Sequence, residues 1–85
     1  MTAKIEVYGT SSCKKCVDVR AFLDGKDIEY IDYLIDLMPL EKDDMIRRSG
    51  LKYYPQIFIN GKHIGGDEEL LALEVSGALN KLLGL

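Results

Sequence analysis

The two thiols of the chain stand close together near its N-terminus. Cys13 and Cys16 are the only cysteines among 85 residues, and Lys14 and Lys15 separate them. Residues three apart on a helix share one face, and their Cα atoms then fall within the roughly 4.4–6.8 Å range that a disulfide requires. Because such a bond closes a very short loop, it would add little to stability. The spacing therefore favours a pair that opens and closes during a reaction over a structural cross-link.

The two sulfurs are expected to differ in charge. A helix is predicted to begin at Cys13, where unpaired N–H groups and the positive end of the helix dipole favour a thiolate. Lys14 and Lys15 add positive charge, so we expect them to stabilise that thiolate and to attract anionic partners. Cys16 lies one turn further on and faces the core, where its thiol would stay protonated. This difference suits Cys13 as the nucleophile and Cys16 as the resolving thiol.

Two other roles for the cysteine pair stay open at this point. Buried cysteines are often inert, but that role leaves their spacing at a predicted helix start unexplained. A closed zinc site takes four ligands, whereas this chain offers Cys13, Cys16 and His63. A metal site would therefore have to be shared between two chains. A C-x-x-C motif beside a β-α-β pattern otherwise indicates redox chemistry.

A β-α-β unit positions the cysteines. Residues 4–8 alternate between polar and apolar side chains and predict a strand. A helix follows from about residue 13 to residue 24, with Ser12 as its N-cap. Residues 28–32 predict a second strand, which a right-handed crossover would place parallel to the first.

The rest of the chain predicts a helix, a hairpin and a final helix. Pro39 suits the first turn of a helix that ends near Ser49 and Gly50. Asn60 and Gly61 predict a two-residue hairpin turn. The remaining elements are strands at residues 56–59 and 62–64 and a helix that begins at Asp67 and is interrupted at Gly77.

The order β-α-β-α-β-β-α predicts an α/β fold, a four-stranded mixed sheet flanked by helices. If the third strand runs opposite to the first, three distant segments meet at one edge of the sheet. These are Cys13 after the first strand, Pro55 before the third, and Gly66 and Asp67 after the fourth. Open α/β sheets bind ligands beyond their strand ends, so we expect a binding site at this edge.

Size and charge narrow the class of protein. A chain of 85 residues has the size of one domain, expected to span residues 1–85. Its net charge of −3, with acidic and basic residues mixed, argues against nucleic acid, which needs a clustered basic face. No apolar run approaches the roughly 20 residues of a membrane span, and the N-terminus lacks the apolar stretch of a secretory signal. We expect a monomer in the cytoplasm, where thiols are kept reduced.

Three segments resemble the glutaredoxin family, which has a thioredoxin-like fold. The longest is the run YPQIFINGKHIGG from Tyr54 to Gly66, followed by DEELLAL. The others are residues 8–16 and the tripeptide Arg48-Ser49-Gly50. The resemblance extends over nearly the whole chain, from about Lys4 to Leu83.

The resemblance implies a site for glutathione. It implies a cis peptide bond before Pro55, facing the cysteines, which exposes the backbone of Tyr54 to pair with a peptide or glutathione like an added strand. Gly66 and Asp67 would hold the γ-glutamyl end, because a helix N-terminus offers N–H groups to a carboxylate. Glu68 stands where the family often has aspartate. Glutathione is therefore the expected co-substrate, and no permanently bound cofactor is expected.

The chain departs from the family pattern around the cysteines. Thr10 stands where the family usually has a lysine that contacts the glycine carboxylate of glutathione, and Lys14 and Lys15 replace the usual proline and tyrosine. Lys15 would supply the missing charge. Tyr53 and Tyr54 are bulkier than the usual threonine and valine. These departures concern the ligand and leave the dithiol chemistry unchanged.

The first hypothesis is a thiol–disulfide oxidoreductase. Cys13 would attack a protein disulfide or a glutathione mixed disulfide, and Cys16 would resolve the product through a Cys13–Cys16 disulfide. One alternative is a small redoxin that a thioredoxin reductase reduces and that donates electrons to an enzyme such as ribonucleotide reductase. The other is a carrier that holds a metal or an iron–sulfur cluster between two chains through Cys13.

Overall fold

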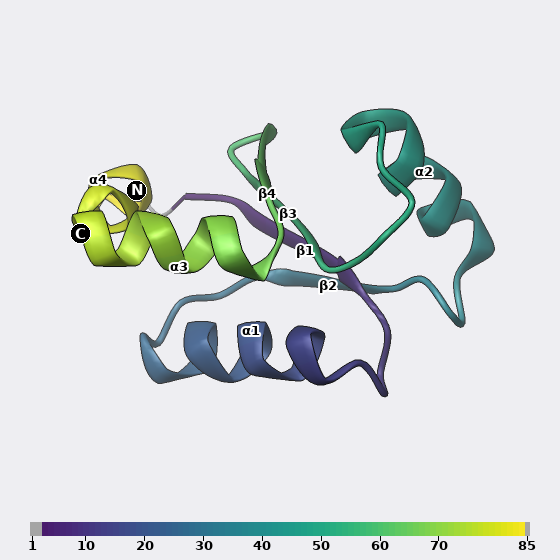
Figure 1. Ribbon diagram of the computed structural model, residues 1–85, viewed down its shortest axis with the longest axis horizontal. Helices are drawn as coiled ribbons and strands as arrows, with labels where there is room; N and C mark the ends of the chain where they lie inside the picture. Colours follow the sequence, from purple (N-terminus) through teal and green to yellow (C-terminus); the bar gives the residue numbers. More distant parts are fainter. Residues whose placement is uncertain (1–2, 85) are drawn as a thin grey trace.

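The structure is a computed structural model that describes residues 3–84, and within them a central sheet has helices on both faces (Figure 1). None of the helices in this range is long and apolar enough to cross a membrane. In chain order the elements are β1 (Ile5–Gly9), α1 (Lys14–Gly25), β2 (Ile31–Leu34), α2 (Pro39–Ser49), β3 (Gln56–Ile59), β4 (Lys62–Gly65), α3 (Asp67–Ser76) and α4 (Ala78–Leu83).

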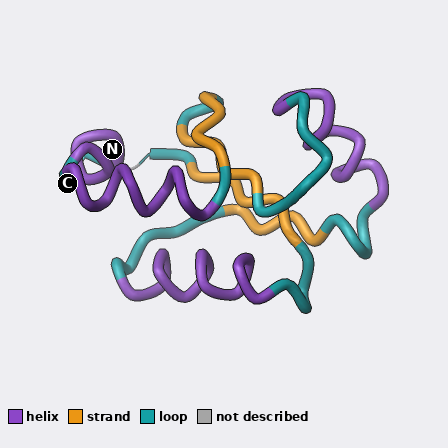
Figure 2. Tube along the Cα trace, in the orientation of Figure 1, coloured by secondary structure: helices purple, strands orange, loops and turns teal. Residues whose placement is uncertain are grey.

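The sheet is mixed, and its strand order is β2-β1-β3-β4. Figure 2 shows its strands in orange between the helices. β1 pairs in parallel with β2 and antiparallel with β3, and β3 pairs antiparallel with β4. Tyr8 is opposite Gln56, and Ile57 is opposite Gly65. The end of β1, the start of β3 and the end of β4 therefore lie at one edge of the sheet. This arrangement confirms the predicted α/β fold with a mixed four-stranded sheet.

One face of the sheet carries an apolar core beneath α1, α3 and α4. The pairing of β1 with β3 sets Ile5 opposite Ile59 and Val7 opposite Ile57, so alternate residues of both strands point to this face. Full burial of one such side chain contributes roughly 1.5–3 kcal/mol. The buried members of this core are Ile5, Val7, Val19, Leu23, Ile57, Ile59, Leu70, Leu79 and Leu83.

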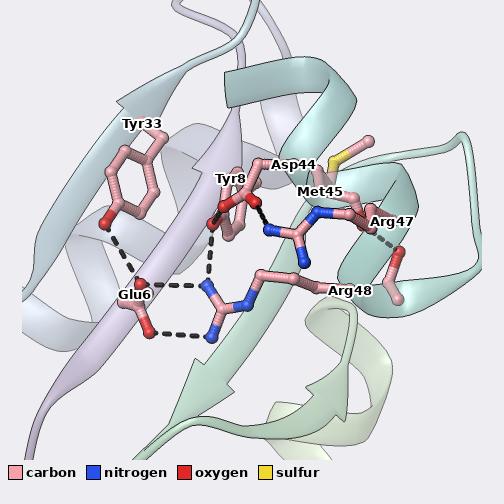
Figure 3. A network of polar contacts seen from close by, with 8 residues as sticks. Glu6, Tyr8, Tyr33, Asp44, Met45, Arg47 and Arg48 are labelled. Carbon is pink, nitrogen blue, oxygen red and sulfur yellow. Dashed lines mark hydrogen bonds and ion pairs between the residues drawn. The ribbon is translucent and has the colours of Figure 1, made fainter. Parts of the chain in front are cut away.

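The opposite face is covered by α2 and holds a network of charged and hydroxyl groups (Figure 3). Arg48 of α2 donates two hydrogen bonds to the carboxylate of Glu6 on β1, at 3.0 and 3.1 Å. It donates a third, at 2.7 Å, to the hydroxyl of Tyr8, which itself donates to Asp44 at 2.8 Å. The guanidinium also lies 4.0 Å from the centre of the Phe58 ring. Because each charged group is paired, the face can bury an ion pair.

The second strand differs from its predicted position. β2 spans Ile31–Leu34 rather than residues 28–32, and its pairing with β1 begins at Ile31. Ile28 and Tyr30 precede it and pack, partly buried, against the apolar core. The alternating pattern that predicted a strand therefore reflects packing of the connecting segment, which lies outside the hydrogen-bonded ladder.

The proline and the turn residues after β2 lie where the sequence predicted them. Pro39 is the first residue of α2, and Gly50 caps its end with a φ of 74°. Asn60 and Gly61 form the hairpin turn with φ angles of 53° and 81°. Gly77, at φ 82°, ends α3 and separates it from α4. Glycine adopts such positive φ angles without the steric cost that a side chain brings.

Candidate active site

Cys13 is the N-cap residue of α1. Its backbone is extended (φ −79°, ψ 122°), the helix begins at Lys14, and its Sγ accepts a hydrogen bond from the backbone N–H of Cys16 at 3.3 Å. The prediction of Ser12 as the N-cap was therefore wrong, because the sulfur of Cys13 takes the place of a capping oxygen. A negative charge on this sulfur would be stabilised by the N–H and by the positive end of the helix.

Cys16 is the shielded member of the pair. It is 0% exposed, whereas Cys13 is only partly buried, and both thiols are free. Burial, followed by the contact with Cys13, raises the pKa of the Cys16 thiol to about 12. The sulfur fits because Gly9 has no side chain: a β-carbon there would lie 2.6 Å from Cys16 Sγ. The structure thus sets one accessible thiol in front of one that stays protonated at neutral pH.

The two lysines between the cysteines have different surroundings. Lys14 Nζ lies 3.3 Å from a carboxylate oxygen of Asp18, and both side chains are largely exposed. An exposed pair of this kind on a helix is worth only about 0.3–0.5 kcal/mol. Lys15 instead lines a pocket, although neither cysteine is among the residues that line it. Of the two, Lys15 is the one placed to meet a ligand.

That pocket has a volume of about 180 Å³ and joins three segments that are distant in sequence. It lies where the start of α1, the segment before β3 and the start of α3 meet. Six of the predicted site residues line it, together with Tyr53 and Glu69. Thr10 does not line it: this residue is buried, and its backbone hydrogen-bonds to the Cys16 thiol. The six are Lys15, Tyr54, Pro55, Gly66, Asp67 and Glu68.

The start of α3 forms one wall of the pocket. Glu69 reaches back and accepts a hydrogen bond from the N–H of Gly66 at 2.7 Å. The N–H of Gly66 is therefore already paired within the chain, and the N–H groups of the first helical turn beyond it are the ones that a carboxylate could reach. A β-carbon on Gly66 would lie 3.1 Å from the carbonyl oxygen of Pro55, so the glycine brings the two walls close together.

The segment before β3 forms the opposite wall. The peptide bond between Tyr54 and Pro55 is cis, as the family resemblance implied. Gln56, which is 0% exposed, donates a hydrogen bond from its side-chain amide to the carbonyl of Tyr53 at 3.0 Å. Its amide oxygen lies 2.7 Å from Nε2 of His63 on β4. The buried amide of Gln56 therefore holds the segment before Pro55 in place through its hydrogen bond to Tyr53.

Three residues that shape the site carried no clear signal in the sequence. Gly9 makes room for the Cys16 sulfur, Gln56 holds the segment before Pro55, and Glu69 occupies the N–H of Gly66. The position of Glu69, three residues after the helix cap, is that of a capping box and was the one available clue.

Comparison with known proteins identifies the family. The family model described as Glutaredoxin matches residues 5–64. Glutaredoxin 3 of Escherichia coli (strain K12) is 38% identical over 81 residues, which cover 95% of this chain and 98% of that protein. The solution structure of glutaredoxin from Brucella melitensis aligns with a TM-score of 0.81 at 34% identity, covering 96% of this chain and 89% of that one.

A further solved structure supports the fold. The crystal structure of a buckwheat glutaredoxin–glutathione complex aligns with a TM-score of 0.86 at 24% identity and covers 94% of this chain and 76% of that chain. The family model covers the cysteine pair and the segment before β3, and the alignment with the Escherichia coli protein extends over 95% of the chain. The chain therefore belongs to the glutaredoxin family and is a thiol–disulfide oxidoreductase.

Proposed function

We propose that Cys13 is the nucleophile and Cys16 the resolving thiol of this oxidoreductase. The observation that carries the assignment is the capping geometry: the Cys13 sulfur is partly exposed and accepts the Cys16 N–H, while Cys16 is fully buried behind it. A thiolate is the attacking species in thiol–disulfide exchange. Only the first sulfur combines access to a substrate with a backbone donor.

The dithiol reaction proceeds in two exchanges. The Cys13 thiolate attacks one sulfur of a substrate disulfide, forms a mixed disulfide and releases the other substrate sulfur as a thiol. Cys16 then attacks Cys13, which forms the Cys13–Cys16 bond and releases the second substrate thiol. Two electrons pass from the cysteine pair to the substrate. Two molecules of a thiol reductant return the pair to its starting state.

Glutathione is the co-substrate that the pocket suits best. Lys15 of α1 and the acidic residues Asp67 and Glu68 of α3 all line the pocket. Glutathione carries carboxylates and an ammonium group, so the lysine would face a carboxylate and the acidic side chains the ammonium. The first turn of α3 adds N–H donors for the γ-glutamyl carboxylate. The buckwheat relative was solved as a complex with glutathione.

Protein disulfides and glutathione mixed disulfides are the proposed substrates. Tyr53 and Tyr54 stand at the rim of the pocket and are 62% and 41% exposed. Exposed tyrosines beside a reactive thiol offer contact area to a protein partner. Two free thiols suit a reducing compartment, and we place the protein in the cytoplasm, acting as a monomer.

Single-cysteine variants test the assignment. Cys13→Ser should abolish activity on every disulfide, whereas Cys16→Ser should lose dithiol activity and keep the reduction of a glutathionylated peptide. Ser12→Ala, which changes a neighbouring hydroxyl outside the helix cap, serves as the matched control and should behave as the wild type. Dithiol activity that survives in Cys13→Ser would overturn the roles.

The choice of reductant needs a separate assay. The oxidised protein is offered glutathione with glutathione reductase, and in parallel a thioredoxin reductase, each with NADPH. We expect rapid NADPH oxidation in the first mixture and slow oxidation in the second. Rapid turnover with thioredoxin reductase alone would replace glutathione as co-substrate and leave the thiol chemistry in place.

A further inference from the structure

In the resolving step, the buried thiol of Cys16 must lose its proton. Cys16 is 0% exposed, and its ionised sulfur must attack Cys13 once a mixed disulfide has formed. Burial is the largest cause of its raised pKa, because a low-dielectric interior disfavours the charged form. A cation close to this sulfur would make the step faster.

Arg20 lies beside Cys16 on the same face of α1. The two residues are four apart on the helix, and residues with that spacing are neighbours. A β-carbon placed on Gly9 would lie 2.6 Å from Cys16 Sγ and 3.3 Å from Arg20 Nη2. The sulfur and Nη2 of the guanidinium therefore both lie close to Gly9 at the end of β1, where the glycine contributes no side chain.

In the part of the chain that the structure describes, Nε of the Arg20 guanidinium is hydrogen-bonded and Nη2 is not. Arg20 Nε donates to Asp32 of β2 at 3.0 Å, and the side chain is 15% exposed. Nη2 is buried and has no hydrogen-bond partner among residues 3–84. A buried donor without a partner is uncommon in a folded protein and calls for an explanation.

We propose that Arg20 stabilises the thiolate of Cys16 during the resolving step and so sets how much of the reaction follows the dithiol route. The inference rests on the proposed roles of Cys13 and Cys16. Arg20 is a positioning residue, which acts on the substrate only through Cys16. Its unpaired Nη2 is the donor that a charged sulfur beside Gly9 would satisfy.

The charges around Cys16 support this direction. Burial and then Cys13 disfavour its thiolate, whereas a backbone hydrogen bond from Thr10 and, to a smaller extent, the Arg20 charge favour it. Asp32 faces Arg20 from β2 and offsets part of the guanidinium charge. Arg20 is the cation that acts on this sulfur, since Lys14 pairs with Asp18 on the exposed side of the helix.

The step is balanced in atoms and charge. The Cys16 thiolate attacks Cys13 Sγ, the Cys13–Cys16 bond forms, and the bond from Cys13 to the substrate sulfur breaks. The two cysteines are oxidised and the departing sulfur is reduced. The proton that Cys16 loses is balanced by the proton that the departing thiolate takes up. Arg20 supplies charge and a hydrogen-bond donor and is itself unchanged.

The test follows the mixed disulfide directly. Reduced protein is mixed with oxidised glutathione, quenched with acid and analysed by mass spectrometry, which separates the glutathione adduct of Cys13 from the intramolecular disulfide. In Arg20→Met we expect the adduct to persist and its conversion to slow by about tenfold, as for the loss of one neighbouring charge. Arg20→Lys keeps the charge and should recover most of the rate.

Two further readouts separate charge from structure. Alkylation of Cys13 by iodoacetamide reports the nucleophile alone and should be unchanged in Arg20→Met. The resolving rate should rise with pH in each variant, and Arg20→Met should need a pH about one unit higher to match the wild type. Arg47→Met, which removes an exposed arginine of α2, is the matched control and should leave the rate unchanged.

A second variant tests the same effect of charge on Cys16 if Arg20→Met folds poorly. Asp32→Asn removes the carboxylate that faces Arg20 and leaves the cation in place. We expect its resolving rate to equal or exceed that of the wild type. Slowing in Asp32→Asn and in Arg20→Lys as large as in Arg20→Met would overturn the charge argument. Absence of any Cys13 adduct in Cys16→Ser, where Cys16 cannot resolve it, would instead overturn the proposed function.

Discussion

The two faces of the sheet bury different kinds of side chain. Beneath α1, α3 and α4 the core is apolar, and Cys16 shares the buried side of α1 with Val19 and Leu23. Beneath α2 the core combines a small apolar cluster with the paired charges of Arg48 and Glu6 (Figure 3). The apolar face gives the resolving thiol a setting that keeps it protonated. On the polar face, the pairing of Arg48 with Glu6 holds α2 against the sheet. The segment that leads to Pro55 begins at the end of this helix.

The largest expected effect comes from the apolar face. Leu23→Ala removes a side chain that is 0% exposed and leaves a cavity. We expect a loss of about 2–5 kcal/mol in the free energy of unfolding, measured with urea. Leu71→Ala, at an exposed position of α3, is the control and should change stability by less than about 0.5 kcal/mol. Equal losses in both variants would contradict the assigned core.

A single substitution in the polar face should lower the free energy of unfolding by less, and a second substitution should restore part of the loss. Arg48→Met leaves the nearly buried carboxylate of Glu6 without its partner, at a cost of about 1.5–3 kcal/mol. The double variant Arg48→Met with Glu6→Leu should recover part of that loss, because removal of both charges leaves neither one buried and unpaired. A double-mutant cycle from urea unfolding measures the coupling. Strictly additive losses would count against the ion pair.

The two faces should also differ in their response to acid. Hydrogen bonds from Arg48 hold the pKa of Glu6 below its ordinary value of 4.5. Glu6 therefore contributes stability that is fully present above pH 4.5 and is lost as the pH falls through the lowered pKa of the folded state. Glu6→Gln should flatten this part of the profile of unfolding free energy against pH. Leu23→Ala should lower the whole profile without changing its shape.

The smallest expected effect concerns one hydroxyl of the network. Tyr33 donates to Glu6 at 3.1 Å and stacks on Tyr8 at 4.5 Å between ring centres. Tyr33→Phe removes the hydrogen bond and keeps the ring, so we expect a loss of about 0.5–1.5 kcal/mol. The same substitution in a Glu6→Gln background should cost less. An undiminished loss there would place the contribution of Tyr33 in its ring contacts.

Local sequence signals predicted much of the fold. Pro39, Asn60, Gly61 and Gly77 each restrict or permit a particular backbone conformation, and the structure uses each one as predicted. The second strand was displaced because side-chain alternation does not distinguish packing of a connecting segment, as at Ile28, from pairing in a ladder. The antiparallel direction of β3 relative to β1 was only a supposition, which the pairing of these two strands confirms.

The site was predictable to the level of residues but not of contacts. The glutaredoxin resemblance gave most of the residues that line the pocket, but not Tyr53 or Glu69. The pairing of the Gly66 N–H with Glu69 depends on where a long side chain folds back. The spacing of Cys16 and Arg20 puts them on one side of the helix, but the approach of Nη2 to Gly9 depends on how the strand and the helix pack. Contacts of this kind arise from tertiary packing.

The hydrogen bond from the Cys16 N–H to the Cys13 sulfur ties the catalytic cycle to the stability of a helix end. A disulfide sulfur is a poorer hydrogen-bond acceptor than a thiolate, so once Cys13 enters a disulfide the first turn of α1 should fray more readily. Slower deuterium uptake by this amide in the reduced protein than in the oxidised protein would reveal the coupling. A partner that binds only the ordered first turn of α1 would then distinguish the reduced protein from the oxidised one.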